Sequence, residues 1–161
     1  MKQIITYKIR HAEVSEADQL TALAIRSQGS WGYPQAWMDL WRERLTITPE
    51  IIKNSISLVA EYEGVIRGFW CRSFENNAEK PTRGFLFVEP DFIRKGCGKQ
   101  LFQAMKEELV KRNITSFNII AEPNALSFYL RMGGEKILEI ESPTPIRMLP
   151  VIRFDLAKNK K

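Results

Sequence analysis

Residues 88–99 read VEPDFIRKGCGK, and this stretch carries the strongest signal for the fold. It opens at the end of a strongly β-prone segment and closes where apolar residues begin to recur at helical spacing. Pro90 ends the strand, and Gly96 and Gly98 allow the backbone to turn tightly before the helix. The stretch therefore predicts a strand, a basic loop and a helix in direct succession.

A loop of this kind is suited to bind phosphate. The first turn of a helix presents free N–H groups and the positive end of the helix dipole, and both attract phosphate oxygens. Arg94, Lys95 and Lys99 add positive charge to the loop. Its spacing fits neither a Walker A loop, which needs Gly-Lys-Ser/Thr, nor the GxGxxG fingerprint of dinucleotide sites. Two glycines in an ordinary turn before a helix are the alternative interpretation.

Strands and helices alternate on both sides of this stretch. Period-two alternation predicts strands, whereas three- and four-residue spacing predicts helices. We expect strands at residues 4–10, 56–62, 65–72, 83–89, 115–121, 135–140 and 147–156, a hairpin turn at Glu63–Gly64 and a polar turn at 76–81. We expect helices after Ser15, from Pro34, at Pro49, after Gly98 and over 124–132. This order predicts an α+β domain with a mixed sheet.

Length and composition indicate one folded domain spanning residues 1–161. The 161 residues are 44% hydrophobic and 27% charged, as in an ordinary globular protein. The net charge of +5 suits an anionic partner such as nucleic acid, an anionic membrane surface or a phosphorylated cofactor. No apolar run approaches the ~20 residues that span a bilayer, and the N-terminus reads as a strand. We therefore expect a cytoplasmic protein without a membrane partner.

Metal sites and histidine-based catalysis are not predicted. Cys71 and Cys97 lack CxxC spacing, and His11 is the single histidine. These residues supply neither a disulfide framework nor a zinc site, and they do not support a Ser-His-Asp or Cys-His catalytic machine.

Two motifs resemble the GNAT superfamily of N-acetyltransferases. Residues 93–98, IRKGCG, resemble its motif A, Gln/Arg-x-x-Gly-x-Gly/Ala, with Ile93 at the Gln/Arg position. Residues 124–133, NALSFYLRMG, resemble its Asn-x-x-Ala-x-x-Phe-Tyr-x-x-x-Gly-Phe helix, with the alanine displaced and Gly134 in place of the final phenylalanine. The order of elements matches as well, so the resemblance covers nearly the whole chain. It implies a mixed, mainly antiparallel central sheet that is flanked by helices and splayed between its fourth and fifth strands.

The resemblance implies acetyl-CoA as cosubstrate, held where strands 83–89 and 115–121 splay apart. The pantetheine arm would pair with main-chain groups of Phe87 and Val88, as an added strand does, and Asn124 would hydrogen-bond the same arm. The cofactor-binding residues that it implies are Phe87, Val88, Arg94, Lys95, Gly96, Cys97, Gly98, Lys99, Asn124, Phe128 and Tyr129.

Tyr129 is the general acid that the resemblance implies, because a phenol near the sulfur donates a proton as charge develops on the departing thiolate. The acceptor would be an amine that attacks the acetyl group directly in a ternary complex, after a base has taken its proton. Glu122 is the leading candidate for that base, Glu61 and Glu89 are others, and a water chain is the alternative. A core-facing aromatic pair is the alternative interpretation of Phe128 and Tyr129.

Aromatic residues gather around the break between the first two helices, at Trp31, Tyr33, Trp37 and Trp41. We expect Trp31, Tyr33 and Trp37 to bind the acceptor, since binding sites combine aromatic side chains with few polar groups. Core packing is the alternative for Trp37 and our interpretation of Trp41. Ser27 with residues 31–33, and residues 147–150, resemble one bacterial branch of the family, whose substrates are mostly unassigned. The acceptor stays open between a small-molecule amine and a protein N-terminus, and so does a homodimer.

Cys97 stands at the predicted helix N-terminus among cations, where a thiol is expected to have a lowered pKa. A reactive thiolate at this place would permit an acetyl-cysteine intermediate. The family has a variable small or apolar residue at this position, so we interpret Cys97 as a packing residue.

Two other functions compete with acetyl transfer. Residues 83–88, RGFLFV, resemble the RNP1 strand of RNA-recognition motifs, although Leu86 and Pro90 replace a small and an aromatic residue of that motif. The chain also has more elements than the βαββαβ unit, so we do not expect a nucleic-acid partner. The second alternative is a CoA-binding sensor without catalysis, against which the retained Tyr129 and Asn124 argue.

Overall fold

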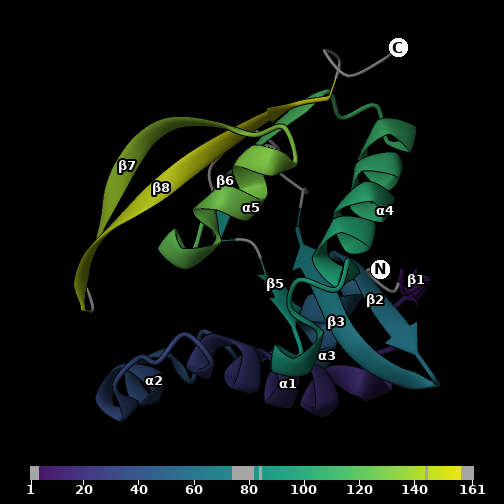
Figure 1. The fold of residues 1–161 in the computed structure, drawn as a ribbon, viewed down its shortest axis with the longest axis horizontal. Coiled ribbons are helices and arrows are strands. Elements are labelled where there is room, and N and C mark those ends of the chain that lie inside the picture. The colour runs from purple at the N-terminus through teal and green to yellow at the C-terminus, as the bar shows by residue number, and fades with distance from the viewer. Residues whose placement is uncertain (1–3, 74–81, 84, 144, 157–161) are drawn as a thin grey trace. The chain divides into compact units, whose positions relative to one another are not determined.

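The structure, a computed structural model, describes residues 4–73, 82–83, 85–143 and 145–156 (Figure 1). The chain folds into two compact units. Of the described residues, 4–73 and 85–105 form the first unit, and 82–83, 106–143 and 145–156 form the second. In the described part of the chain, no helix combines the length and the apolar character that crossing a bilayer requires.

A four-stranded antiparallel sheet forms the centre of the first unit. Its strands, in spatial order, are β1 (Lys8–His11), β2 (Ile56–Tyr62), β3 (Val65–Arg72) and β5 (Phe85–Val88). Glu63 and Gly64 connect β2 to β3 with positive φ values of 55° and 75°, as a two-residue type I′ turn requires. The predicted hairpin is confirmed.

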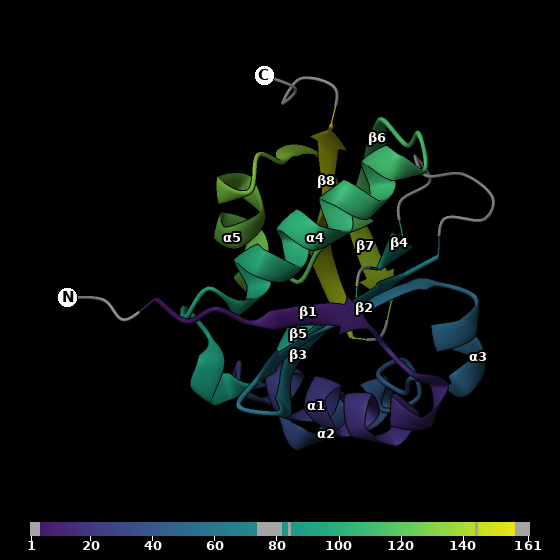
Figure 2. The ribbon, with the colours of Figure 1, turned by 90° about the vertical axis from the view of Figure 1, so that its right-hand side faces the viewer.

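Helical segments cover one face of this sheet (Figure 2). They are the 3-10 turn η1 (Val14–Glu16) and the helices α1 (Ala17–Gly29), α2 (Gln35–Trp41) and α3 (Pro49–Lys53). Thr48 caps α3, because its hydroxyl accepts a hydrogen bond from the N–H of Ile51 at 3.1 Å. Buried side chains of α1, among them Leu20 and Leu23, join Phe69 of β3 in the core between the helices and the sheet.

The helix α4 (Cys97–Lys111) contributes residues to both units, and its first half packs on the opposite face of β3. Side chains alternate between the two faces of a strand. Phe69 therefore points to the core under α1, while Gly68 and Trp70 point to α4. Trp70 stacks on Phe102 with 5.1 Å between the ring centroids, which fixes the start of α4 against the sheet.

The second unit holds a mixed four-stranded sheet. Its strands, in spatial order, are β4 (Thr82–Arg83), β6 (Ser116–Ile120), β8 (Ile146–Asp155) and β7 (Glu135–Pro143). The pair β4–β6 is parallel and the other neighbours are antiparallel. The short helices η3 (Pro123–Ala125) and α5 (Leu126–Arg131) follow β6. Phe117 and Phe154 stack with 5.0 Å between their centroids and form part of this unit's core.

The α+β class and the mainly antiparallel pairing are confirmed, but the strands form two sheets where we expected one. The segment expected as a single strand, 83–89, divides between them, because β4 pairs with β6 and β5 pairs with β3. A period-two pattern indicates a strand but carries no information on its partner, so the sequence did not reveal this division. Residue 84 and the predicted polar turn at 76–81 lie outside the described residues.

Candidate functional site

The loop between β5 and α4 turns sharply before the helix begins. Residues 90–92 form the 3-10 turn η2 (Pro90–Phe92), and α4 starts at Cys97. Arg94 and Gly96 have positive φ values, 66° and 84°. Glycine adopts this conformation without steric cost, whereas a residue with a side chain rarely does. The predicted glycine turn is thus confirmed at Gly96.

Consecutive N–H groups at the start of α4 are available to a ligand. Within the described residues, the backbone N–H groups of residues 96–99 donate to no acceptor. The side chains of Arg94, Lys95 and Lys99 are exposed, and none forms an ion pair with a described carboxylate. A row of donors with three cations beside it has the chemistry to bind a phosphate or pyrophosphate group.

The side chain of Cys97 points into the core of the first unit. Its residue is 1% exposed, and a Cβ placed on Gly68 would lie 2.6 Å from its Sγ. Burial raises the pKa of the Cys97 thiol to about 12. The expected lowering is therefore wrong, because desolvation of the thiolate outweighs the helix dipole and the neighbouring cations. Burial agrees with the interpretation of Cys97 as a packing residue.

The main chain of β5 has one side bonded to β3 and one side facing away from it. The N–H of Glu89 donates to the carbonyl of Arg67 at 2.7 Å, and in an antiparallel ladder the bonded residues alternate. The main-chain groups of Phe87 therefore face β3, in register with Phe69, while those of Leu86 and Val88 face away. We expected the main chain of Phe87 to be open to the pantetheine arm, but the open main-chain groups before Val88 are those of Leu86.

Helix α1 holds the end of β5 with two adjacent side chains. The N–H of Val88, on the side away from β3, donates to Ser27 Oγ at 3.3 Å. The guanidinium of Arg26 donates to both carboxylate oxygens of Glu89, and this hydrogen bonding raises the pKa of Arg26. The point at which β5 ends and the loop begins is thus fixed from the helix side.

Two of the candidate bases pair with arginines of the first unit. Glu89 is bound by Arg26, and Glu61 accepts from Arg10 at 2.8 Å. Arg10 also pairs with Glu16, at 2.7 Å. These contacts give Glu61 and Glu89 a structural role in connecting elements of the first unit.

The predicted acceptor-binding aromatics have different surroundings. Trp31 is 40% exposed. Trp37 stacks on Tyr33 with 5.6 Å between centroids and meets Trp41 edge-on at 5.9 Å, so Trp37 is part of the packing around α2. Trp41 is buried, as we interpreted it. Tyr33 also lines a pocket.

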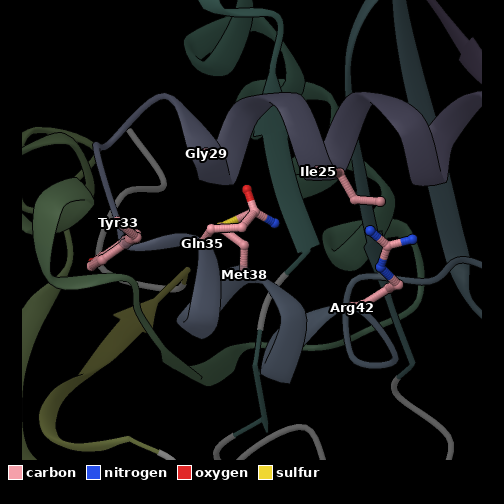
Figure 3. Close-up of a pocket in the computed structure, with 6 residues that line it drawn as sticks. All are labelled: Ile25, Gly29, Tyr33, Gln35, Met38 and Arg42. Atoms are coloured by element: carbon pink, nitrogen blue, oxygen red, sulfur yellow. The ribbon is translucent and has the colours of Figure 1, made fainter.

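This pocket lies between α1 and α2 and has a volume of about 210 Å³ (Figure 3). Its lining consists of Ile25, Gly29, Tyr33, Gln35, Met38 and Arg42. Ile25 and Gly29 are four residues apart on α1, whereas Ser27 is two residues from each, about 200° around the helix. The pocket is therefore on the side of α1 opposite to Ser27 and does not include the edge of β5.

The strand compared with RNP1 lacks the geometry of an RNA-binding platform. Its residues divide between β4 and β5, which belong to different sheets. Phe85 and Phe87 pack against the core under α1–α3, whereas RNP1 aromatics are exposed to stack on bases. This observation removes the basis of the RNA-binding hypothesis.

In the second unit, Glu122 and Asn124 form a local cluster. Glu122 caps η3, since its Oε1 accepts from the N–H of Asn124 at 3.3 Å and from its Nδ2 at 2.9 Å. Its Oε2 lies 3.7 Å from Arg147 Nη1, on β8. Arg147 thus connects β8 to the turn that carries Asn124, a contact that spacing along the sequence did not reveal.

Tyr129 lies on α5 and is 5% exposed. Its ring meets Phe128 edge-on at 5.2 Å and Phe154 at 6.2 Å between centroids. The carbonyl of Tyr129 accepts from the N–H of Gly134 at 3.0 Å, which ends the helix. The ring therefore packs in the core of the second unit.

The predicted site residues fall into two groups. Residues 87–99 lie together in the first unit, and residues 122–129 lie together in the second. The two groups belong to different units. Sequence reasoning missed the outward main-chain groups of Leu86 and the contacts of Arg26, Ser27 and Arg147. Polar side chains on helices and strands carry no local signal of such partners.

Comparison with known proteins supplies the family. The profile of the Acetyltransferase (GNAT) domain matches residues 18–150. The chain belongs to the GNAT acetyltransferase family. Its fold is that of solved GNAT structures, such as the PaiA N-acetyltransferase of Thermoplasma acidophilum in complex with coenzyme A. That structure has a TM-score of 0.74 and 16% identity over 94% of this chain and 99% of the other.

Curated GNAT relatives match at low identity. The peptidyl-lysine N-acetyltransferase YiaC of Escherichia coli (strain K12) is 25% identical over 90% of this chain and 98% of its own length. An uncharacterised N-acetyltransferase, ycf52 of Porphyra purpurea, is 30% identical, but the match spans 48% of this chain and 45% of that protein. Membership in the GNAT family places the chain among the acetyl-CoA-dependent N-acetyltransferases.

Proposed function

We propose that this GNAT protein transfers the acetyl group of acetyl-CoA to an amine by direct attack in a ternary complex. The observation that carries the proposal is the row of N–H groups at residues 96–99, which have no acceptor within the described residues. Such a row, flanked by Arg94, Lys95 and Lys99, fits the pyrophosphate of a CoA ester. The coenzyme A bound to the Thermoplasma acidophilum protein supports the same choice.

When bound, acetyl-CoA supplies the acetyl group as an activated thioester. The outward main-chain groups of Leu86 and the outward carbonyl of Val88, whose N–H is bound by Ser27, would align the pantetheine arm as an added strand does, and Asn124 would hydrogen-bond it. Tyr129 would donate a proton to the sulfur as the C–S bond breaks. The chain thus contributes positioning and protonation of the leaving group.

Glu122 is our candidate for the group that takes the proton of the amine, with a water chain as the alternative. The acceptor is proposed to be a primary amine on a small molecule. A protein N-terminus and a peptide lysine are the competing acceptors, the latter because the relative YiaC is named for it. Trp31 and Tyr33 are proposed to contact the acceptor.

The first experiment is a melting-temperature titration with acetyl-CoA, CoA, ATP and a short RNA. A ligand at 100 times its Kd stabilises the folded state by about 2.7 kcal/mol, or about 5–11 °C for a domain of this size. We expect a rise with both CoA species and none with RNA. No rise with either CoA species would overturn the proposal.

The role of Tyr129 is tested with Tyr129→Phe, which keeps the ring contacts to Phe128 and Phe154. We expect kcat to fall by about 10²-fold or more while the Kd of acetyl-CoA stays unchanged, since general-acid catalysis contributes at least that factor. Equal turnover of the variant and the wild type would remove Tyr129 from the mechanism. Release of CoA thiol measures kcat, and calorimetry measures the Kd.

A further inference from the structure

Tyr7 is a buried tyrosine whose hydroxyl reaches the phosphate loop. The residue lies directly before β1 and is 5% exposed. Its ring centroid lies 6.1 Å from that of Tyr62 and 6.4 Å from that of Phe92, on the loop itself. Its Oη donates a hydrogen bond to the carbonyl of Lys95 at 3.1 Å. An aromatic cluster thus carries one polar contact to the loop backbone.

The backbone of Tyr7 is fixed by Gln100, on the first turn of α4. The Oε1 of Gln100 accepts from the N–H of Tyr7 at 3.0 Å, and its Nε2 donates to the carbonyl of Ile5 at 2.7 Å. The side-chain amide pairs with the extended segment as a neighbouring strand would. Because the N–H of Gln100 also donates to the carbonyl of Gly96 at 3.0 Å, Tyr7 and the loop are held to the same helical turn.

The carbonyl that Tyr7 binds belongs to the same peptide group as the first donor of the row. In a planar trans peptide, the carbonyl of Lys95 and the N–H of Gly96 point in opposite directions. Fixing the carbonyl towards Tyr7 therefore directs the N–H away from Tyr7. Gly96, with φ of 84°, has no Cβ to restrict rotation of this peptide, so the orientation depends on the hydrogen bond.

We propose that Tyr7 is a positioning residue for phosphate recognition, because its hydroxyl orients the Lys95–Gly96 peptide so that the N–H of Gly96 faces the pyrophosphate of acetyl-CoA. The inference rests on the proposed function. Burial, together with the nearby Cys97 and Tyr62, raises the pKa of Tyr7 to about 12. The hydroxyl is therefore protonated and able to donate at neutral pH, where the binding assays are run.

The test is Tyr7→Phe, which removes the hydroxyl and keeps the ring. The variant is compared with the wild type in the Kd of acetyl-CoA and in kcat/KM with acetyl-CoA and with S-acetylpantetheine, which lacks the phosphate groups. We expect the Kd of acetyl-CoA to rise roughly three- to ten-fold, the range of one lost hydrogen bond. We expect kcat at saturation and kcat/KM with S-acetylpantetheine to stay unchanged.

The matched control is Tyr62→Phe, which removes a hydroxyl from the same aromatic cluster. Within the described residues that hydroxyl has no hydrogen-bond partner, and we expect no change in the Kd of acetyl-CoA. A second variant, Gln100→Ala, releases the Ile5–Tyr7 segment and should weaken acetyl-CoA in the same direction as Tyr7→Phe.

The outcomes separate the two proposals. If the wild type binds no acetyl-CoA, the proposed function fails and the role of Tyr7 fails with it. If the wild type binds and Tyr7→Phe binds equally well, the role of Tyr7 alone is refuted. Equal loss with both acetyl donors would also refute it, since that pattern indicates general damage to the fold.

Discussion

Replacing Gly68 by alanine should separate β3 from the start of α4. The added Cβ would lie 2.6 Å from Sγ of Cys97, 3.1 Å from the carbonyl oxygen of Phe87 and 3.2 Å from Cδ1 of Leu101. Non-bonded heavy atoms are at optimal separation at about 3.5–4.0 Å, so the contact with the sulfur forces one element to move. Overpacking of this kind costs about 1–3 kcal/mol.

The assay is thermal unfolding of Gly68→Ala beside the wild type. For a domain of this length, 1 kcal/mol corresponds to about 2–4 °C, so the melting temperature should fall by about 2–12 °C. Because Cys97 is the first residue of α4, the displacement also reaches the N–H row. We therefore expect weaker acetyl-CoA binding in the same variant.

The double variant Gly68→Ala/Cys97→Ala isolates the cause. Removing Sγ eliminates the 2.6 Å contact, so the double variant should be at least as stable as Gly68→Ala alone. The two changes should then couple by about 1 kcal/mol or more in a double-mutant cycle. Additive losses, or an unchanged melting temperature for Gly68→Ala, would refute this reasoning.

Two further predictions concern titratable groups. The free energy of unfolding should fall as the pH rises from about 9 to about 12. Folded Cys97 and Tyr7, each with a pKa of about 12, keep protons that the unfolded chain releases in this range. Urea titrations at several pH values measure the free energy, and a flat profile would contradict the burial of both groups. Glu122→Gln keeps an oxygen that accepts from Asn124 but removes the proposed base. We therefore expect kcat to fall by about 10²-fold, with an unchanged Kd of acetyl-CoA. An unchanged kcat would leave Glu122 only its capping role at η3.

The local elements were predictable because their signals are local. The hairpin at Glu63–Gly64 and the turn at Gly96 follow from backbone conformations that few residues tolerate. The same reasoning placed the strand that ends before Pro90. It assigned outward-facing main-chain groups to Phe87, whereas the structure has them at Leu86. Which residues face outward is set by the hydrogen bond from Glu89 to Arg67 on β3, and this bond has no signal within the strand's own sequence.

The environment of Cys97 was not predictable from its neighbours in sequence. A helix N-terminus among cations indicates a reactive thiol, but the side chain lies under Gly68, a residue 29 positions earlier in the chain. Tyr7 was missed for the same reason, since its partners Lys95 and Gln100 are far along the chain. Such long-range pairs depend on the packing of the whole first unit.

Residues of α1 contact two different parts of the first unit, the end of β5 and a pocket. Arg26 and Ser27 hold the end of β5, and substitutions there disturb the edge that we propose for the cofactor. Ile25 and Gly29 line the pocket, about 200° around the helix from Ser27. We expect substitutions at Ile25 to change the lining of the pocket while the hydrogen bond from Val88 to Ser27 stays intact. Variants at this position can therefore be screened for altered ligand preference without disturbing the edge of β5.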